Sequence, residues 1–237
     1  MKYIPPLDRG TLVRRYKRFL ADIELPDGRL ITIHCPNTGS MKNCAEPGDE
    51  VWYSTSSNPS RKYACTWELS RTRRGHYIGV NTGRANELIQ DAIQEGIIQE
   101  LSGYTGMKRE VGYGKENSRI DLLLTEHDRW PDCYVEVKSV TLLEQAGRGY
   151  FPDAVSDRGT RHLRELMEVV RSGARGVLCF CVQHSAIRSV SPAVHIDHQY
   201  SATLQSAIDV GVEVIAYKAR MSPSATRIQR PVPVVMP

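Results

Sequence analysis

The stretch YVEVKSV, residues 134–140, decides which fold this sequence can adopt. Its β-branched residues predict a short buried strand, yet it also carries a carboxylate at Glu136 and an ammonium group at Lys138. Side chains alternate between the two faces of a strand, so Glu136 and Lys138 share one face while Val135 and Val137 pack on the other. On a buried strand, this charged pair needs polar or charged partners from other parts of the chain.

The first such partner is Asp121, which lies in the strand-like run SRIDLLL, residues 118–124. A hairpin between neighbouring strands can bring Asp121 face to face with Glu136. Two carboxylates held close repel each other unless a cation lies between them, and Mg²⁺ (or Mn²⁺) prefers carboxylate, water and phosphate oxygens. We therefore assign Asp121 and Glu136 as candidate metal ligands, and with Lys138 as candidate catalytic residues. The alternative is a weak pair between Glu136 and Lys138 on an exposed strand.

A helix predicted over RGTRHLRELMEVVRS, residues 158–172, follows these strands. Arg158, His162 and Glu165 share one face of it, because they are spaced four and three positions apart. Arg158 and His162 are candidate contacts for nucleic-acid phosphates. An ordinary polar helix face is the alternative, especially for Glu165.

The first third of the chain holds all of its basic excess. Residues 1–82 contain 13 Lys and Arg against 8 Asp and Glu, whereas residues 83–237 contain 18 against 19. Cations alternate with aromatic residues in RRYKRF (14–19) and RTRRGHY (71–77), a pattern suited to contacting phosphates and stacking on bases. The candidate nucleic-acid-binding residues here are Arg14, Arg15, Lys17, Arg18, Arg71, Arg73 and Arg74. A solvated basic face on edge strands is the alternative interpretation.

The same segment predicts an all-β barrel. FLADIEL (19–25) and RLITIHC (29–35) flank the turn residues Pro26-Asp27-Gly28, and DEVWYSTSS (49–57) and YACTWELSR (63–71) add two more strands. Short strands in a basic segment favour an OB-fold that binds nucleic acid. We place this domain at residues 1–82.

The pattern after residue 82 predicts a second domain, residues 83–237. A helical run over 84–98 precedes three strands over 107–114, 118–126 and 133–142, and two helices then alternate with two strands up to residue 219. This order predicts an α/β fold with a mixed sheet flanked by helices. The Pro-rich tail from residue 222 is expected to be loosely attached.

Longer strings of the sequence resemble a known family. HCPNTGSM (34–41), VNTGRANELIQDAI (80–93) and FPDAVSDRGTRHLREL (151–166), together with SRID and YVEVKSVTL, look like the bacterial sugar fermentation stimulation protein A family. The resemblance covers nearly the whole chain. It implies an N-terminal OB-fold and a C-terminal restriction-endonuclease-like domain with the PD-(D/E)XK motif, whose acids fall on Asp121 and Glu136 and whose lysine falls on Lys138. Ile120 stands where that motif has proline.

The resemblance is compatible with two hypotheses about function, one an enzyme and the other a non-catalytic binding protein. The family is described as binding DNA without sequence preference, so the first hypothesis is a DNA-binding protein that hydrolyses phosphodiester bonds of nucleic acid with Mg²⁺ or Mn²⁺. The second is a non-catalytic DNA-binding regulator of sugar (maltose) metabolism genes. A metabolic enzyme or small-molecule binder that uses the same acids is a more distant third. In FPDAVSDRG, Asp153 is either a helix cap or a further acid near the metal, and Glu110 is another possible ligand.

Composition excludes several classes of protein. With 41% hydrophobic and 24% charged residues, the chain is not disordered as a whole. We find no secretory signal and no apolar run long enough to span a membrane, so a cytoplasmic location is expected. Six cysteines are too sparse for a disulfide scaffold, and Cys179 and Cys181 on one apolar strand are expected in the core rather than on zinc.

Overall fold

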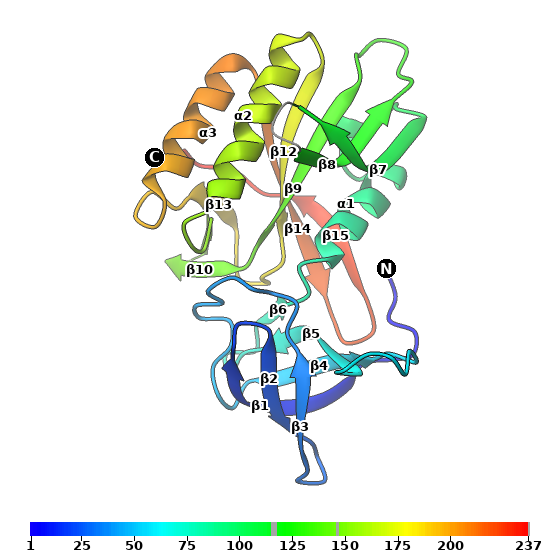
Figure 1. The fold of residues 1–237 in the computed structure, drawn as a ribbon, viewed down its shortest axis with the longest axis vertical. Helices are drawn as coiled ribbons and strands as arrows, with labels where there is room; N and C mark the ends of the chain where they lie inside the picture. Colours follow the sequence, from blue (N-terminus) through cyan, green and yellow to red (C-terminus); the bar gives the residue numbers. More distant parts are fainter. Residues whose placement is uncertain (115–117, 146, 237) are drawn as a thin grey trace.

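The computed structural model describes residues 1–114, 118–145 and 147–236. It shows a β-barrel formed by the first third of the chain and, above it in Figure 1, a sheet with helices on both faces. No helix within the described ranges is long and apolar enough to cross a membrane.

The barrel confirms the predicted OB-fold. Its strands are β1 (Asp8–Tyr16), β2 (Leu20–Glu24), β3 (Leu30–His34), β4 (Glu50–Thr55), β5 (Cys65–Arg71) and β6 (Tyr77–Gly79). They pair in the order β3-β2-β1-β4-β5-β6, and a parallel contact between His34 and Thr66 closes the barrel by joining β3 to β5. Gly28 has a φ of +84° in the predicted turn between β2 and β3, and Trp67 fills the barrel core.

The second domain confirms the predicted α/β architecture. Its main sheet has the order β15-β14-β12-β9-β8-β7, in which β9, β12 and β14 run parallel and the other pairs are antiparallel. The strands are β7 (Gly106–Tyr113), β8 (Ser118–Thr125), β9 (Cys133–Val140), β12 (Arg175–Val182), β14 (Glu213–Met221) and β15 (Thr226–Pro231). Cys179 and Cys181 lie in the core of this sheet as unpaired thiols, as expected.

Helices cover both faces of the main sheet. Helix α1 (Arg84–Gln94) packs on one face, while α2 (Asp157–Arg171) and α3 (His198–Val210) pack together on the other. A short 3₁₀ helix, Gln99–Leu101, follows α1. The apolar residues at helical spacing in 84–98 are those that α1 buries, so the amphipathic pattern explains its docking.

A smaller sheet was not predicted. It consists of β10 (Leu142–Gln145), β11 (Arg148–Phe151) and β13 (Ser189–Pro192) in the order β10-β11-β13. These strands have four residues each, too few for alternation to distinguish them from loops.

The prediction of a loosely attached tail was wrong. Residues Thr226–Pro231 form β15, which pairs with β14 at the edge of the main sheet, and Ile228 and Val232 are buried. Prolines do not make this segment loose, because Pro231 terminates an edge strand, a position that tolerates the missing N–H group.

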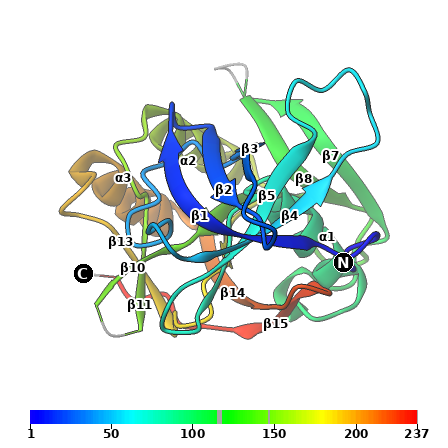
Figure 2. The same cartoon turned by 90° about the horizontal axis from the view of Figure 1, so that it is seen from below.

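The first residues of the chain leave the barrel and join the second domain. Tyr3 lies in the same core cluster as α1, and its hydroxyl is 3.0 Å from Oγ1 of Thr226 in β15. Lys2 forms a bridge with Ala225. Figures 1 and 2 both show this N-terminal segment beside β15 and α1.

A junction loop, residues 36–44, ties the barrel to the second domain. Asn43 Nδ2 donates to the carbonyl of Leu143 at 3.1 Å, and Cys44 Sγ to that of Thr141 at 3.3 Å. A second tie is the ion pair of Glu68, on β5, with Arg84, at the start of α1. The two domains are therefore held together by polar contacts as well as by packing.

Candidate functional site

The hairpin of β8 and β9 brings Asp121 and Glu136 together at the point where its ladder ends. Paired residues run from Leu124↔Cys133 to Leu122↔Val135, so Asp121 and Glu136 would form the next pair. Instead, the N–H of Val137 donates to Asp121 Oδ2 at 2.7 Å. The backbone thus holds the Asp121 carboxylate in place.

The alternation predicted for β9 is present. Val135 and Val137 pack into the core cluster that includes α1. Glu136 and Lys138 lie on the α2 side, where Lys138 Nζ donates to Glu136 Oε1 at 2.5 Å. Glu136 is only 1% exposed, so this is a buried ion pair rather than a weak surface pair.

Helix α2 contributes His162 to this site. Its Nδ1 hydrogen-bonds Glu136 Oε1, and its Nε2 accepts a hydrogen bond from Arg158 Nε at 3.3 Å. Because Nε2 accepts, the network assigns the proton to Nδ1 and makes His162 the donor to Glu136. The sequence predicted nucleic-acid contacts for both residues. His162 is 3% exposed and faces Glu136 instead, whereas Arg158 is exposed and its contact stays a prediction.

The surroundings shift the pKa values of the two acids in opposite directions. Burial and the nearby charge of Glu136 raise the pKa of Asp121 to about 6, against hydrogen bonds from Val137 and Asn86. Burial also opposes ionisation of Glu136, but the hydrogen bond from His162 and the charge of Lys138 outweigh it and keep its pKa below the ordinary value. Glu136 is therefore firmly anionic, while Asp121 is destabilised as an anion.

This environment fits a divalent cation. Glu136 Oε2 is buried and has no hydrogen-bond partner among the described residues, which is costly for a carboxylate oxygen. A cation bound by Asp121 and Glu136 would satisfy that oxygen and remove the repulsion that raises the Asp121 pKa. The described residues contain no group of three or more His, Cys, Asp or Glu side chains arranged to hold a metal, so the protein would supply two carboxylates.

The two further acids considered from the sequence, Glu110 and Asp153, make no contact with Asp121 or Glu136 that the structure records among the described residues. Glu110 occupies the position on β7 opposite Asp121, with a φ of +51°, and its side chain is exposed. Asp153 accepts hydrogen bonds from Ser40 and from the N–H of Met41 in the junction loop. It does not cap α2, because Ser156 is the cap.

The basic residues near the start of the barrel divide into two groups. Arg15 donates through Nη2 to the carbonyls of Asn37 and Gly39, both at 2.9 Å, and Arg18 donates to that of Thr38 at 3.0 Å. These two arginines therefore hold the junction loop.

Arg14 pairs with Asp22 and lies over the Tyr16 ring, and Lys17 is exposed in the β1–β2 turn. These are the two cations of this stretch that do not hold the junction loop. Their predicted contacts with nucleic acid stay predictions.

The second basic stretch lies on the exposed end of β5 and the turn after it. Arg71 pairs with Glu50 and lies over the Tyr77 ring, and Arg73 donates to the carbonyl of Pro47. Arg73 and Arg74 line a cavity of about 770 Å³. The guanidinium groups are accessible here, as a phosphate contact requires.

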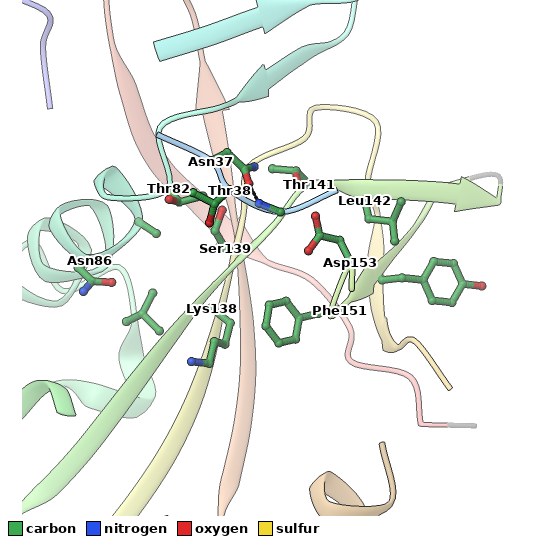
Figure 3. A pocket seen from close by; sticks show the side chains of 14 residues that line it. Asn37, Thr38, Thr82, Asn86, Lys138, Ser139, Thr141, Leu142, Phe151 and Asp153 are labelled. Carbon is green, nitrogen blue, oxygen red and sulfur yellow. Dashed lines mark hydrogen bonds between the residues drawn. The ribbon is translucent and has the colours of Figure 1, made fainter. Parts of the chain in front are cut away.

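A smaller cavity of about 310 Å³, shown in Figure 3, is lined by residues that contact the two acids. It is lined by Lys138 and Ser139 of β9, by Asn86 of α1 and by residues 37–39 of the junction loop. Asn86 also donates to Asp121 Oδ1 at 2.8 Å, so one residue joins the cavity to the acids.

Sequence reasoning missed two contributors to this site. Asn86 lies in a predicted amphipathic helix. Its polar amide, near the start of an otherwise apolar face, is the only sequence signal of its role in the site. The junction loop is marked in the sequence only by the turn residues Pro36, Asn37 and Gly39. Its closeness to Lys138 follows from the docking of the two domains, which no local pattern encodes.

Comparisons with known proteins agree with this architecture. The family model SfsA N-terminal OB domain matches residues 13–80, and the Sugar fermentation stimulation protein RE domain matches residues 83–225. The Sugar fermentation stimulation protein homolog of Shewanella loihica is 59% identical over 234 residues, with 99% of each chain covered. That of Shewanella frigidimarina is 62% identical over 228 residues, covering 96% of this chain and 97% of the relative.

A solved structure of Pyrococcus furiosus SfsA in complex with Ca²⁺ has the same fold. Its TM-score is 0.88 at 24% sequence identity, and the match covers 99% of this chain and 98% of that one. The two-domain arrangement is therefore common to both proteins.

Proposed function

The chain belongs to the sugar fermentation stimulation protein family, and we propose that it binds DNA without sequence preference and hydrolyses phosphodiester bonds of nucleic acid with a divalent metal ion. The observation that carries this proposal is the buried Oε2 of Glu136, which has no hydrogen-bond partner in the described part of the chain and lies beside Asp121 and Lys138. A purely structural ion pair would leave no carboxylate oxygen unsatisfied.

The metal ion we propose is Mg²⁺ or Mn²⁺, held by Asp121 and Glu136. The relative from Pyrococcus furiosus was solved with Ca²⁺, which also prefers oxygen ligands. Such an ion, when bound, lowers the pKa of a coordinated water and offsets the charge that develops on phosphate. Val137 and Asn86 orient the Asp121 carboxylate through their two hydrogen bonds, and His162 orients that of Glu136.

Lys138 is the group that we assign to the reacting phosphate. Its ammonium now contacts Glu136 Oε1, and its side chain is 15% exposed, so it borders solvent and the cavity. From this position it can donate to a phosphate oxygen or hold the attacking water as that water loses a proton. Tyr113, on β7, has a buried hydroxyl, and burial together with the charges of Glu136, Glu165 and Asp121 raises its pKa, so it stays neutral.

The barrel and helix α2 supply the grip on DNA in this proposal. Lys17 and Arg74 are exposed, and Arg158 is exposed close to the acids. Contacts of this kind bind phosphates without regard to base sequence, so affinity should fall steeply as salt is raised. An affinity that does not change between low and physiological salt would contradict DNA binding through these residues.

The test incubates the full chain with single-stranded DNA, duplex DNA and RNA, with Mg²⁺, with Mn²⁺ and with EDTA. We expect metal-dependent cleavage that falls about 10²–10⁴-fold in Asp121→Ala and in Lys138→Ala. Asp132→Ala is the matched control, because Asp132 is an exposed acid in the loop before β9. Binding without cleavage under every condition would reject hydrolysis and favour the regulatory hypothesis.

A further inference from the structure

The cavity of about 310 Å³ beside the acids has no role in the metal chemistry described above. We propose that it receives one unpaired base of the bound strand, next to the phosphate at Asp121 and Glu136. The preferred substrate would then be single-stranded or locally unpaired nucleic acid. This inference rests on the proposed function and specifies its substrate.

The first argument is position. Lys138 lines the cavity and also contacts Glu136, and Asn86 lines it and also contacts Asp121. A phosphate held at the acids would therefore place its neighbouring nucleotide at the mouth of the cavity.

The second argument is size. At about 310 Å³ the cavity lies at the lower end of the range of small-molecule pockets, roughly 300–1,000 Å³, so it admits one nucleotide and excludes a double helix. Residues 37–39 of the junction loop form one wall of the cavity. A base must leave its stack to enter, which costs least where it is already unpaired.

The third argument is the chemistry of the lining. The lining combines neutral hydrogen-bonding side chains with aromatic rings, apolar residues and a carboxylate. The lining residues include Asn37, Thr38, Thr82, Asn86 and Ser139, with Phe151 and Asp153. Figure 3 shows Thr38, Thr82 and Ser139 close together, with Phe151 and Asp153 across from them. Lys138 is the one cation among the residues that line it, so the cavity suits a base, with its polar edge and apolar faces, better than a second phosphate.

The fourth argument is that the loop is fixed before any ligand binds. Arg15 and Arg18 hold the carbonyls of residues 37–39, and Asn37 Oδ1 accepts from the N–H of Gly39 at 2.8 Å. On the other side, Ser40 and Met41 bind Asp153. Because this wall is already ordered, binding costs little conformational entropy. Arg15 and Arg18 contribute to substrate selection by holding the wall in place.

The test measures affinity by fluorescence anisotropy in EDTA, so that it does not depend on cleavage. The probes are a labelled single strand, a blunt duplex of equal length and that duplex with one central mismatch. We expect the single strand and the mismatched duplex to bind about tenfold more tightly than the blunt duplex. In Thr38→Trp, where an indole fills the mouth from an exposed position, this preference should disappear.

Two further variants keep the test decisive. Ser60→Trp puts the same indole on an exposed barrel loop away from the cavity and should retain the preference. Thr38→Val, nearly the same size, should reduce it partly. Equal affinity of the wild-type protein for all three probes, or an unchanged preference in Thr38→Trp, would overturn the inference while leaving DNA binding intact. Failure to bind any probe would instead reject the proposed function itself.

Discussion

His162 on helix α2 donates a hydrogen bond through Nδ1 to Oε1 of Glu136 on strand β9, and Arg158 fixes the orientation of the His162 ring from its other side. The contact crosses from a helix to the sheet and lies almost completely out of solvent. A hydrogen bond of this kind keeps the carboxylate ionised and directs its second oxygen, Oε2, to the position where a cation would bind.

Replacing His162 should therefore weaken metal binding although His162 touches no metal. We expect His162→Ala to reduce the affinity for Mn²⁺ about 10–100-fold, measured by titration calorimetry, because Glu136 loses the donor that orients it. His162→Asn keeps a donor and should recover part of the loss. His198→Ala, an exposed histidine on α3, is the control, and equal affinities in His162→Ala and His198→Ala would contradict the role.

The metal-free protein should become more stable when Asp121 is neutralised. Its folded-state pKa of about 6 exceeds the ordinary 3.8, so the folded protein binds this proton more tightly than the unfolded chain does. Keeping Asp121 ionised above pH 6 therefore costs stability, and the cost fades as the pH falls towards 4. In EDTA at pH 7.5, Asp121→Asn should raise the free energy of unfolding by about 2 kcal/mol in urea titrations.

The same titrations at pH 4 supply the check on sign. There the difference between Asp121→Asn and the wild-type protein should largely disappear. Asp132→Asn, at an exposed acid, should change stability little at either pH. If Asp121→Asn were less stable than the wild-type protein at pH 7.5, the hydrogen bonds to the Asp121 carboxylate would stabilise its ionised form more than burial and Glu136 destabilise it.

The ion pair of Arg84 with Glu68 should be a principal tie between the domains. Arg84 donates to both oxygens of Glu68, which is 2% exposed and also accepts from Ser54 and Asn81. Arg84→Met would leave a buried carboxylate without its cation, and we expect unfolding to become easier by about 1–3 kcal/mol.

A second substitution tests the cause of that loss. Adding Glu68→Gln to Arg84→Met removes the uncompensated charge and keeps a side-chain oxygen that accepts hydrogen bonds. The double variant should therefore recover much of the stability lost in Arg84→Met. Arg171→Met breaks an exposed pair with Glu168 and is the control, with an expected change below about 1 kcal/mol. Additive losses in the double variant would show that charge is not the reason.

Acid should weaken the domain junction through His184. Burial, and then the charges of His76 and Lys218, lower its pKa to about 4, while its Nδ1 accepts from the N–H of Ala186. The unfolded chain takes up this proton below its ordinary pKa of 6.5, so stability is lost as the pH falls from 6.5 to 4. At pH 5 the loss should be about 2 kcal/mol relative to pH 7.5.

His184→Asn should flatten this part of the stability profile, because the asparagine oxygen can accept the same backbone N–H without titrating. Urea unfolding at several pH values between 4 and 7.5 measures the slope. His198→Asn serves as the exposed control. An identical slope in His184→Asn and the wild-type protein would assign the acid sensitivity to other groups.

The sequence predicted what depends on local pattern. Alternation in YVEVKSV placed Glu136 and Lys138 on one face, and hairpin spacing brought Asp121 to them, because strand periodicity and turn length are local properties. Helical spacing put Arg158 and His162 on one side of α2. It could not decide whether that side faces solvent or the sheet, and the structure shows that His162 faces Glu136.

What depended on docking was missed. Arg15 lies in a basic, aromatic stretch typical of nucleic-acid contacts, and nothing in that composition distinguishes a guanidinium that binds phosphate from one that binds the carbonyls of its own loop. β15 was missed for a related reason, since its pairing with β14 joins the end of the chain to a sheet already formed. Such contacts are set by tertiary structure rather than propensity.

The contacts of residues 1–3 with residues 224–226 have a consequence for how the protein is made. Tyr3 contacts Thr226, 223 positions later, so this contact cannot form until β15 has been synthesised. The barrel between them is closed by its own strands and can fold early, as an insertion in a domain that is still incomplete. Contacts this distant in sequence slow folding, so we expect the pairing of residues 1–3 with β15 to be a late folding step.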